Sequence, residues 1–164
     1  MKINILIAFL LLVFGSLEAR HIIGGEITYE CLGTVGGGVR YKFTMLIYRD
    51  CACTNCAPFD EVAAIGIYQC GVNQECGNLN TMDIFSRERV EVEDIQNVNP
   101  PDFPCLEIPP NICVQKGRYE FEKTLPLSDE SYHIIYQRCC RNVTINNIFD
   151  PEAAGASYSV VITP

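Results

Sequence analysis

The stretch YKFTMLI, residues 41–47, begins with strict alternation of apolar and polar side chains. A period of two residues places alternate side chains on opposite faces of a β-strand, so this pattern predicts a strand with one face in a core. The predicted core face carries Tyr41, Phe43, Met45 and Ile47, and the opposite face carries Lys42 and Thr44.

Other segments repeat this period along the chain. The alternating segments are residues 26–31, 118–122, 132–140 and 156–162. Residues 62–68 form a nearly continuous apolar run, which predicts a strand covered on both faces. In residues 89–93, Val90 and Val92 alternate with charged side chains, and so much charge on one face predicts an edge strand.

The number and spacing of these segments indicate the fold class. About seven predicted strands are separated by turn signals such as residues 36–38, 97–104 and 150–155, and no stretch keeps a helical apolar period for three turns. We therefore expect an all-β fold, an antiparallel immunoglobulin-like β-sandwich of about seven strands reinforced by disulfides. No internal repeat or linker divides residues 20–164, which are predicted to form one domain.

Composition excludes two classes of protein. The chain has 164 residues, a formal net charge of −8 and 48% hydrophobic residues, which is too apolar for a disordered acidic tail. An acidic chain lacks the basic surface that binds phosphates, so we expect no nucleic-acid partner.

The N-terminus has the three parts of a secretory signal. Lys2 precedes a mostly apolar run over residues 3–14, and small residues follow, ending with Ala19. The run is too short to span a bilayer, although an N-terminal membrane anchor is the alternative interpretation. We predict a signal peptide over residues 1–19, a mature chain that begins at Arg20, and a secreted, extracellular location with no membrane span.

The ten cysteines all lie in the predicted mature part. An even set of cysteines in an exported chain indicates a disulfide framework, whose pairing the sequence leaves mostly open. Cys139 and Cys140 are adjacent in a predicted strand and should point to opposite faces, which predicts different partners; a vicinal disulfide is the alternative. Cys105 and Cys113 bracket a Pro-rich loop, and a local bridge would close it. The full set is Cys31, Cys51, Cys53, Cys56, Cys70, Cys76, Cys105, Cys113, Cys139 and Cys140.

A metal centre is the competing interpretation of part of this set. Cys51, Cys53 and Cys56 form a C-x-C-x2-C cluster, and thiolates at such spacing can hold zinc or an iron–sulfur cluster. Export exposes these thiols to oxidation, so we expect disulfides, no metal and no cofactor.

Candidate catalytic and binding residues are few. The only histidines are His21 and His133, which are too far apart in the sequence pattern to form a triad with a nucleophile, and Arg49, Asp50, Arg138 and Arg141 flank cysteines without a base beside them. We therefore expect no enzyme. Calcium ligands among Glu88, Glu91, Glu93 and Asp94 lack the spacing of a dedicated loop. Asn142-Val143-Thr144 matches a glycosylation acceptor, and Tyr48, Tyr68 and Phe103 are the loose aromatic candidates for glycan binding.

Five strings resemble one family over nearly the whole predicted mature chain. They are HIIGGEITYECLG (residues 21–33), YRDC (48–51), PCLEIPPNICV (104–114), YHIIYQRCCRN (132–142) and GASYSVVITP (155–164). In this order they resemble the N-terminal module of large Bacteroidetes cell-surface proteins. Those proteins continue into PKD-type repeats and end in a gliding-motility-associated domain used for type IX secretion.

The resemblance carries further expectations. Six cysteines match the usual family set, namely Cys31, Cys51, Cys105, Cys113, Cys139 and Cys140. The four extra ones, Cys53, Cys56, Cys70 and Cys76, imply two additional bridges. The sequence departs from the family at Pro164, where neither repeats nor a sorting domain follow, which suggests a fragment or a missing anchor.

Three hypotheses on function follow. The first is a non-enzymatic structural or adhesive module of a surface protein, whose partners would be the other domains of the same long chain. The second is a binding domain for a surface glycan or protein. The third, a cysteine-based metal or redox protein, is disfavoured by export.

Overall fold

A computed structural model describes residues 21–52, 57–71, 76–99, 104–105, 107 and 111–164. The predicted signal peptide, residues 1–19, and the predicted mature N-terminus at Arg20 lie outside the described residues. Cys53 and Cys56, which were predicted to form disulfides, and Phe103, an aromatic candidate for glycan binding, also lie outside them.

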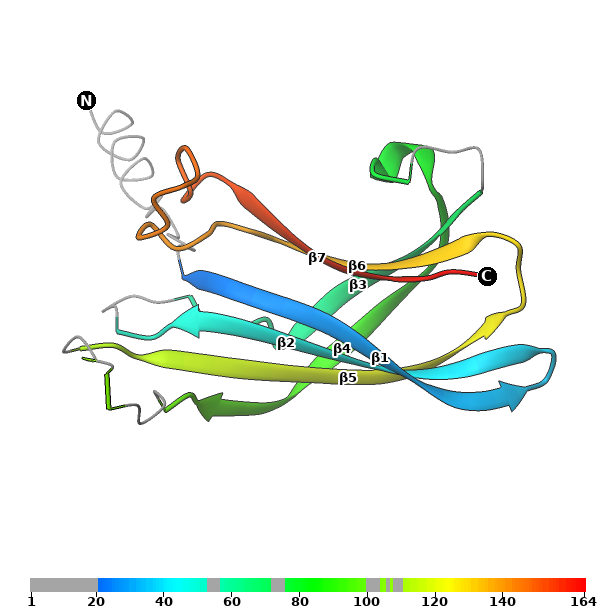
Figure 1. Cartoon of the computed structure of the whole chain (residues 1–164), viewed down its shortest axis with the longest axis horizontal. Coiled ribbons are helices and arrows are strands. Elements are labelled where there is room, and N and C mark those ends of the chain that lie inside the picture. Colours follow the sequence, from blue (N-terminus) through cyan, green and yellow to red (C-terminus); the bar gives the residue numbers. More distant parts are fainter. Residues whose placement is uncertain (1–20, 53–56, 72–75, 100–103, 106, 108–110) are drawn as a thin grey trace, which may run out of the picture.

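Seven antiparallel strands make up nearly all of the regular structure (Figure 1). This confirms the predicted all-β, antiparallel fold. Within the described residues the single helical element is a short 3-10 turn, and no helix is long and apolar enough to cross a membrane. The elements are β1 (Ile22–Val35), β2 (Gly38–Asp50), β3 (Val62–Cys70), η1 (Leu79–Thr81), β4 (Asp83–Asn97), β5 (Val114–Pro126), β6 (Ser131–Cys139) and β7 (Gly155–Ile162).

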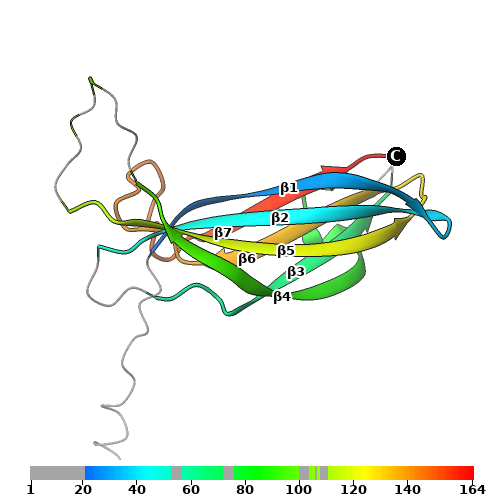
Figure 2. The same cartoon turned by 90° about the horizontal axis from the view of Figure 1, so that it is seen from below.

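The strands follow the order β1-β2-β5-β4-β3-β6-β7 (Figure 2). β4 joins the two halves, because it pairs with β3 as far as Glu91 and with β5 from Val92 onward. A register shift between Val92 and Asp94 marks a bulge, which bends this strand from one layer into the other. The strands can be lettered A to G in chain order. The spatial order β1-β2-β5-β4 then corresponds to the A-B-E-D sheet of an immunoglobulin constant domain, and β3-β6-β7 corresponds to its C-F-G sheet. The immunoglobulin-like assignment stays a prediction that this order supports.

β4 lies inside the strand order, but no residue of 89–93 pairs on both sides. Residues 89–91 pair with β3 alone and Val92 pairs with β5 alone, so each part of this charged stretch is a sheet edge, as the sequence predicted. The acidic side chains of β4 also meet basic side chains of β5. Lys123 lies 2.6 Å from Glu88, and Arg118 lies 3.3 Å from Glu93.

The two ends of the strand order approach each other, so the sheet is nearly closed. Ile22, the first residue of β1, forms an isolated bridge with Arg141, just beyond β6. At Gly25 an added Cβ would lie 3.0 Å from the ring of Tyr158 on β7. Beyond this point β1 departs from β7, and the two layers diverge (Figure 1).

The core lies between the layers, and the alternation in the sequence predicted most of the side chains that fill it, although Tyr29 and Cys31 on the predicted apolar face of residues 26–31 are exposed. Phe43, Met45 and Ile47 of β2 are at most 1% exposed, and Tyr41 is partly buried. Tyr119 of β5 is fully buried. The same inward face recurs on β3, β6 and β7, with Ala63, Ile65, Ile67, Tyr132, Ile134, Tyr136, Ala156 and Ile162.

β3 is less covered than its apolar run predicted. Ile65 and Ile67 are buried, but Ala64 on the opposite face is exposed. Gly66 lies under the ring of Tyr68, since a Cβ there would lie 2.4 Å from the ring edge. One aromatic side chain, rather than a second layer, therefore covers the outer face at this point.

Candidate functional site

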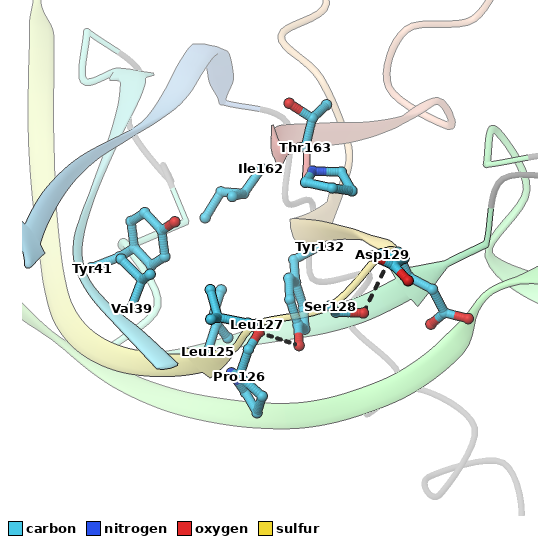
Figure 3. Close-up of a pocket in the computed structure, with 12 residues that line it drawn as sticks. Val39, Tyr41, Leu125, Pro126, Leu127, Ser128, Asp129, Tyr132, Ile162 and Thr163 are labelled. Carbon is cyan, nitrogen blue, oxygen red and sulfur yellow. Dashed lines mark hydrogen bonds between the residues drawn. The ribbon is translucent and has the colours of Figure 1, made fainter. Parts of the chain in front are cut away.

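A groove of about 490 Å³ lies at the end of the sheet where β5 connects to β6 (Figure 3). Val39 and Tyr41 of β2 face it from one layer, and Ile162 of β7 faces it from the other. Leu125, near the end of β5, and Tyr132 of β6 complete its apolar lining. Its volume is within the range of small-ligand sites.

The connection between β5 and β6 forms the rim of this groove. The Tyr132 hydroxyl donates to the carbonyl oxygen of Pro126 at 3.0 Å, and the Glu130 amide donates to Ser128 Oγ at 3.0 Å (Figure 3). Leu127, which is 72% exposed, and Asp129 both line this rim. None of the described lining residues is Lys or Arg, so the groove favours a neutral or cationic group over an anion.

The sequence did not single out this groove. Tyr41 and Tyr132 were predicted as core residues, and the aromatic candidates Tyr48 and Tyr68 do not line it. Tyr41 belongs to an aromatic cluster, with its ring centroid 5.7 Å from that of Tyr29, and burial raises its pKa. The signal available in the sequence was Leu127, an apolar residue inside a polar turn after Pro126.

At the opposite end, polar side chains fix the segment between β2 and β3. The Tyr136 hydroxyl donates to Asp60 Oδ2 at 2.5 Å, and the Tyr119 hydroxyl donates to the Asp60 carbonyl at 2.7 Å. Arg138 donates to the carbonyl of Pro58 at 2.8 Å and lies 3.4 Å from Asp60 Oδ1. Burial, aided by the Asp60 charge, raises the pKa of Tyr119 to about 12 and that of Tyr136 still further above its ordinary value. Both phenols therefore stay protonated near neutral pH and act as structural donors.

Arg49 holds the same segment from β2. Its Nη1 donates to the carbonyl of Ala57 at 2.5 Å, its Nη2 donates to Gln115 Oε1 at 2.6 Å, and its guanidinium lies 5.0 Å from the ring centre of Phe59. Burial lowers the pKa of Arg49, although the guanidinium remains charged at any physiological pH. Arg49 and Arg138 thus anchor the described part of this loop through its backbone carbonyls.

Asn142 lies at the same end and is 4% exposed. Its side-chain amide donates to Asp50 Oδ2 at 3.0 Å, and its Oδ1 accepts from the Thr144 amide at 2.8 Å and from Thr144 Oγ1 at 2.6 Å. Within the acceptor-like triplet the Asn142 side chain is therefore buried, with its amide nitrogen bonded to Asp50, whereas Val143 and Thr144 are exposed.

The first disulfide connects Cys51 with Cys113 across 62 residues. The two residues meet because Asp50 pairs with Val114 where β2 and β5 lie side by side, and the Cys51 amide donates to the Cys113 carbonyl at 2.9 Å. The predicted local bridge between Cys105 and Cys113 is therefore wrong.

The second correction concerns Cys139 and Cys140, which bond to each other. β6 ends at Cys139, and Cys140 has a positive φ of 89°. Because this backbone is not extended, the rule that adjacent side chains point to opposite faces does not apply. The prediction of different partners is wrong, and the vicinal alternative is the observed one.

The remaining described cysteines complete the comparison. Cys70 and Cys76 form a bridge, one of the two additional bridges that the resemblance implied. Cys31 on β1 and Cys105 are exposed and unbonded, so the expectation that all ten cysteines pair is wrong for these two. In the β1–β2 ladder the residue opposite Cys31 is Tyr41, so the described part of this ladder offers Cys31 no cysteine partner.

The two histidines lie at opposite ends of the molecule. His21 precedes β1, whose first residue contacts Arg141 beyond the end of β6. His133 lies near the start of β6, six residues before Cys139, which corresponds to roughly 20 Å of extended strand. Burial lowers the pKa of His133, and its Nε2 lies 3.0 Å from Ser131 Oγ. The two imidazoles therefore cannot share a site.

The comparisons with known proteins add no relative to this picture. No protein-family model, no curated protein and no solved structure matches the chain.

Proposed function

We propose that the chain is a non-enzymatic, exported structural or adhesive module of a bacterial surface protein. The observation that carries this proposal is the position of the described disulfides, which all lie where strands end. Cys51–Cys113 and Cys139–Cys140 lie at one end of the sandwich, and Cys70–Cys76 lies at the end of β3. Bridges at strand ends oppose the fraying by which proteases attack a domain outside the cell.

The resemblance to the N-terminal module of Bacteroidetes surface proteins supplies the context for this role. In that context, the partners of the domain are the later domains of a long chain delivered by type IX secretion. An all-β unit whose loops at one end are fixed by the hydrogen bonds of Arg49, Arg138 and Asp60 suits a module that projects from a surface. The separation of His21 from His133 favours this role over acid–base catalysis.

The test uses cells that express the full chain. We expect protein recovered from the cell surface to begin at or near Arg20, and we expect His21→Ala and His133→Ala to leave adhesion unchanged. The paired change Cys51→Ser with Cys113→Ser should abolish surface retention, because the released ends become protease targets. An intact Met1 on the recovered protein, or an enzymatic turnover lost in His133→Ala with the fold intact, would show the proposal to be wrong.

A binding role for a defined ligand is the second candidate, and the groove favours it. Its aromatic and apolar lining and its acidic rim suit a neutral glycan or a cationic peptide segment. We expect Leu127→Asp to reduce binding on a glycan or peptide array. Phe149→Asp is the matched control, because Phe149 is 98% exposed in the segment between β6 and β7 and does not line the groove. Equal binding by both variants would exclude the groove as the site.

A further inference from the structure

Cys70, Cys76 and His133 form the one group of three possible metal ligands within the described residues, with ligand atoms all within 4.8 Å of one another. The sheet brings two of them together. Cys70 pairs with Ser131 and Tyr68 pairs with His133, so Cys70 and His133 are diagonal neighbours on the outer face of β3 and β6. Cys76 follows β3 in sequence and joins this pair through its bond to Cys70.

The imidazole of His133 is already oriented. Its Nε2 lies 3.0 Å from the Ser131 hydroxyl oxygen, and this hydroxyl also lies 3.3 Å from the Cys70 carbonyl oxygen, to which it can donate. In the tautomer that carries its proton on Nε2, the imidazole donates to Ser131 and the lone pair is on Nδ1. Histidine ligands in metal sites are commonly fixed in this way, with one ring nitrogen donating to the protein and the other facing the metal.

In the structure the two sulfur atoms are joined as a disulfide, which has no thiolate to offer. We propose that Cys70, Cys76 and His133 form a zinc-binding site that is masked by the disulfide and becomes available when a phosphine or dithiol reduces it. Two thiolates and one imidazole are an established zinc donor set, and the fourth position would be taken by water.

The chemistry balances as two steps. A phosphine takes the oxygen of one water molecule and becomes the phosphine oxide, while the two hydrogens of that water become the thiol protons of Cys70 and Cys76. Zinc then displaces these two protons and binds both thiolates.

The structural change required is small. Tetrahedral zinc with Zn–S bonds near 2.3 Å needs the two sulfur atoms about 3.7 Å apart. Cys70 is fixed at the end of β3, so Cys76, which lies in a turn outside the strands, has to move by roughly 2 Å. The ligand atom of His133 lies within 4.8 Å of both sulfur atoms.

Cobalt(II) is the probe for the site, because it reports tetrahedral thiolate coordination by its visible and near-ultraviolet absorption. The full chain is titrated anaerobically before and after treatment with a phosphine, and alkylation with peptide mapping records which bridges have opened. We expect no cobalt spectrum for the oxidised protein. The reduced protein should bind one cobalt with the spectrum of a tetrahedral thiolate site, and zinc should displace it.

Two matched pairs of variants locate the site. The double change C70S/C76S should abolish the spectrum, whereas C139S/C140S should keep it. His133→Gln should weaken binding by at least about tenfold, and His21→Gln should not. Circular dichroism confirms that each variant is folded.

Several outcomes would overturn the proposal. A spectrum that persists in C70S/C76S would assign the metal to other thiols of the reduced chain. Equal affinities in the two histidine variants would remove His133 from the site. A Cys70–Cys76 bridge that stays closed to phosphine in the folded protein, or opens without any cobalt uptake, would also show that the site does not exist.

Discussion

Asn142 connects three separate parts of the chain at the disulfide-bonded end. Its backbone amide donates to the Ile22 carbonyl at 3.0 Å, its side-chain amide reaches Asp50, and its Oδ1 accepts two hydrogen bonds from Thr144. It is the one buried polar or charged residue of the described chain. A buried amide whose groups are all bonded favours one arrangement of the segments around it.

At this residue we predict a large effect of a small change. Asn142→Ala should lower the free energy of unfolding by about 2 kcal/mol, because the Asp50 carboxylate and the two Thr144 donors would lose their hydrogen bonds to the Asn142 side chain. Urea denaturation measures this effect. Asn147→Ala, at an exposed position in the same connection, should change stability by less than about 0.5 kcal/mol. Similar effects from the two variants would contradict the role given to Asn142.

Residue-level sequence reasoning succeeded where the backbone is regular. The alternation that placed Phe43, Met45 and Ile47 in the core depends only on the geometry of an extended strand, and all three are buried. The same geometry gave a wrong partner for Cys140, because its left-handed backbone is not visible in the sequence string. Local alternation thus predicts burial well and disulfide pairing poorly.

Among the elements, β1 depends on two adjacent glycines with different surroundings. At Gly24 an added Cβ would meet nothing within 4 Å. At Gly25 it would lie 2.7 Å from Ile47 Cδ1, 2.9 Å from the Leu46 carbonyl oxygen and 3.0 Å from the ring of Tyr158. Gly25 is therefore the point at which β1 approaches both β2 and β7 closely enough to close the sandwich.

We predict opposite outcomes for alanine at these two positions. Gly25→Ala should destabilise the domain by about 1–3 kcal/mol, because a methyl group there forces β1 away from its neighbours. Gly24→Ala should be neutral or stabilising by up to about 1 kcal/mol, since it only restricts the unfolded chain. Thermal melts of both variants measure the two changes in stability. A loss of stability in Gly24→Ala but not in Gly25→Ala would contradict the close approach assigned to Gly25.

β4 shows that local composition predicted the element and its edge character but not its partners. Its charges and its alternation indicated an edge strand, and residues 89–93 do pair on one side only. The sequence did not reveal that the strand passes from β3 to β5 within this stretch. It also cannot place Lys123 and Arg118 of β5 beside Glu88 and Glu93, which they neutralise.

On the scale of the whole molecule, the three described disulfides should differ in their effects on stability. A bridge stabilises mainly by restricting the unfolded chain, and the effect grows with the length of the loop it closes. Cys51–Cys113 spans 62 residues, Cys70–Cys76 spans 6, and Cys139–Cys140 joins neighbours.

We therefore predict a ranking. Paired serine substitutions should lower the free energy of unfolding by about 4 kcal/mol at Cys51–Cys113, about 2 kcal/mol at Cys70–Cys76 and less than about 1 kcal/mol at Cys139–Cys140. Guanidinium denaturation of the three double variants measures the order. The largest loss at Cys139–Cys140 would mean that this bridge stabilises the folded loop rather than restricting the unfolded chain.

At this scale the fold class was predictable and the candidate sites were not. Six alternating segments and one continuous apolar run were sufficient for an antiparallel all-β domain. The groove depends on the divergence of two layers and on Leu127 in a turn, and the group around His133 depends on the register between β3 and β6. Both arise from segments far apart in the sequence, which no spacing in a single sequence reveals.

The strand order also determines how the domain carries tension. Because each strand is antiparallel to the next along the order, β1 and β7 run in the same direction, and Ile22 and Ile162 lie at opposite ends of the sandwich (Figure 1). A pull between these two residues is directed along the strands, and the hydrogen bonds between strands lie across that direction. The bonds of the β1–β2 and β6–β7 ladders are then loaded together in shear, instead of opening one after another. Such a domain yields at high force along its long axis and at low force when it is peeled from the side.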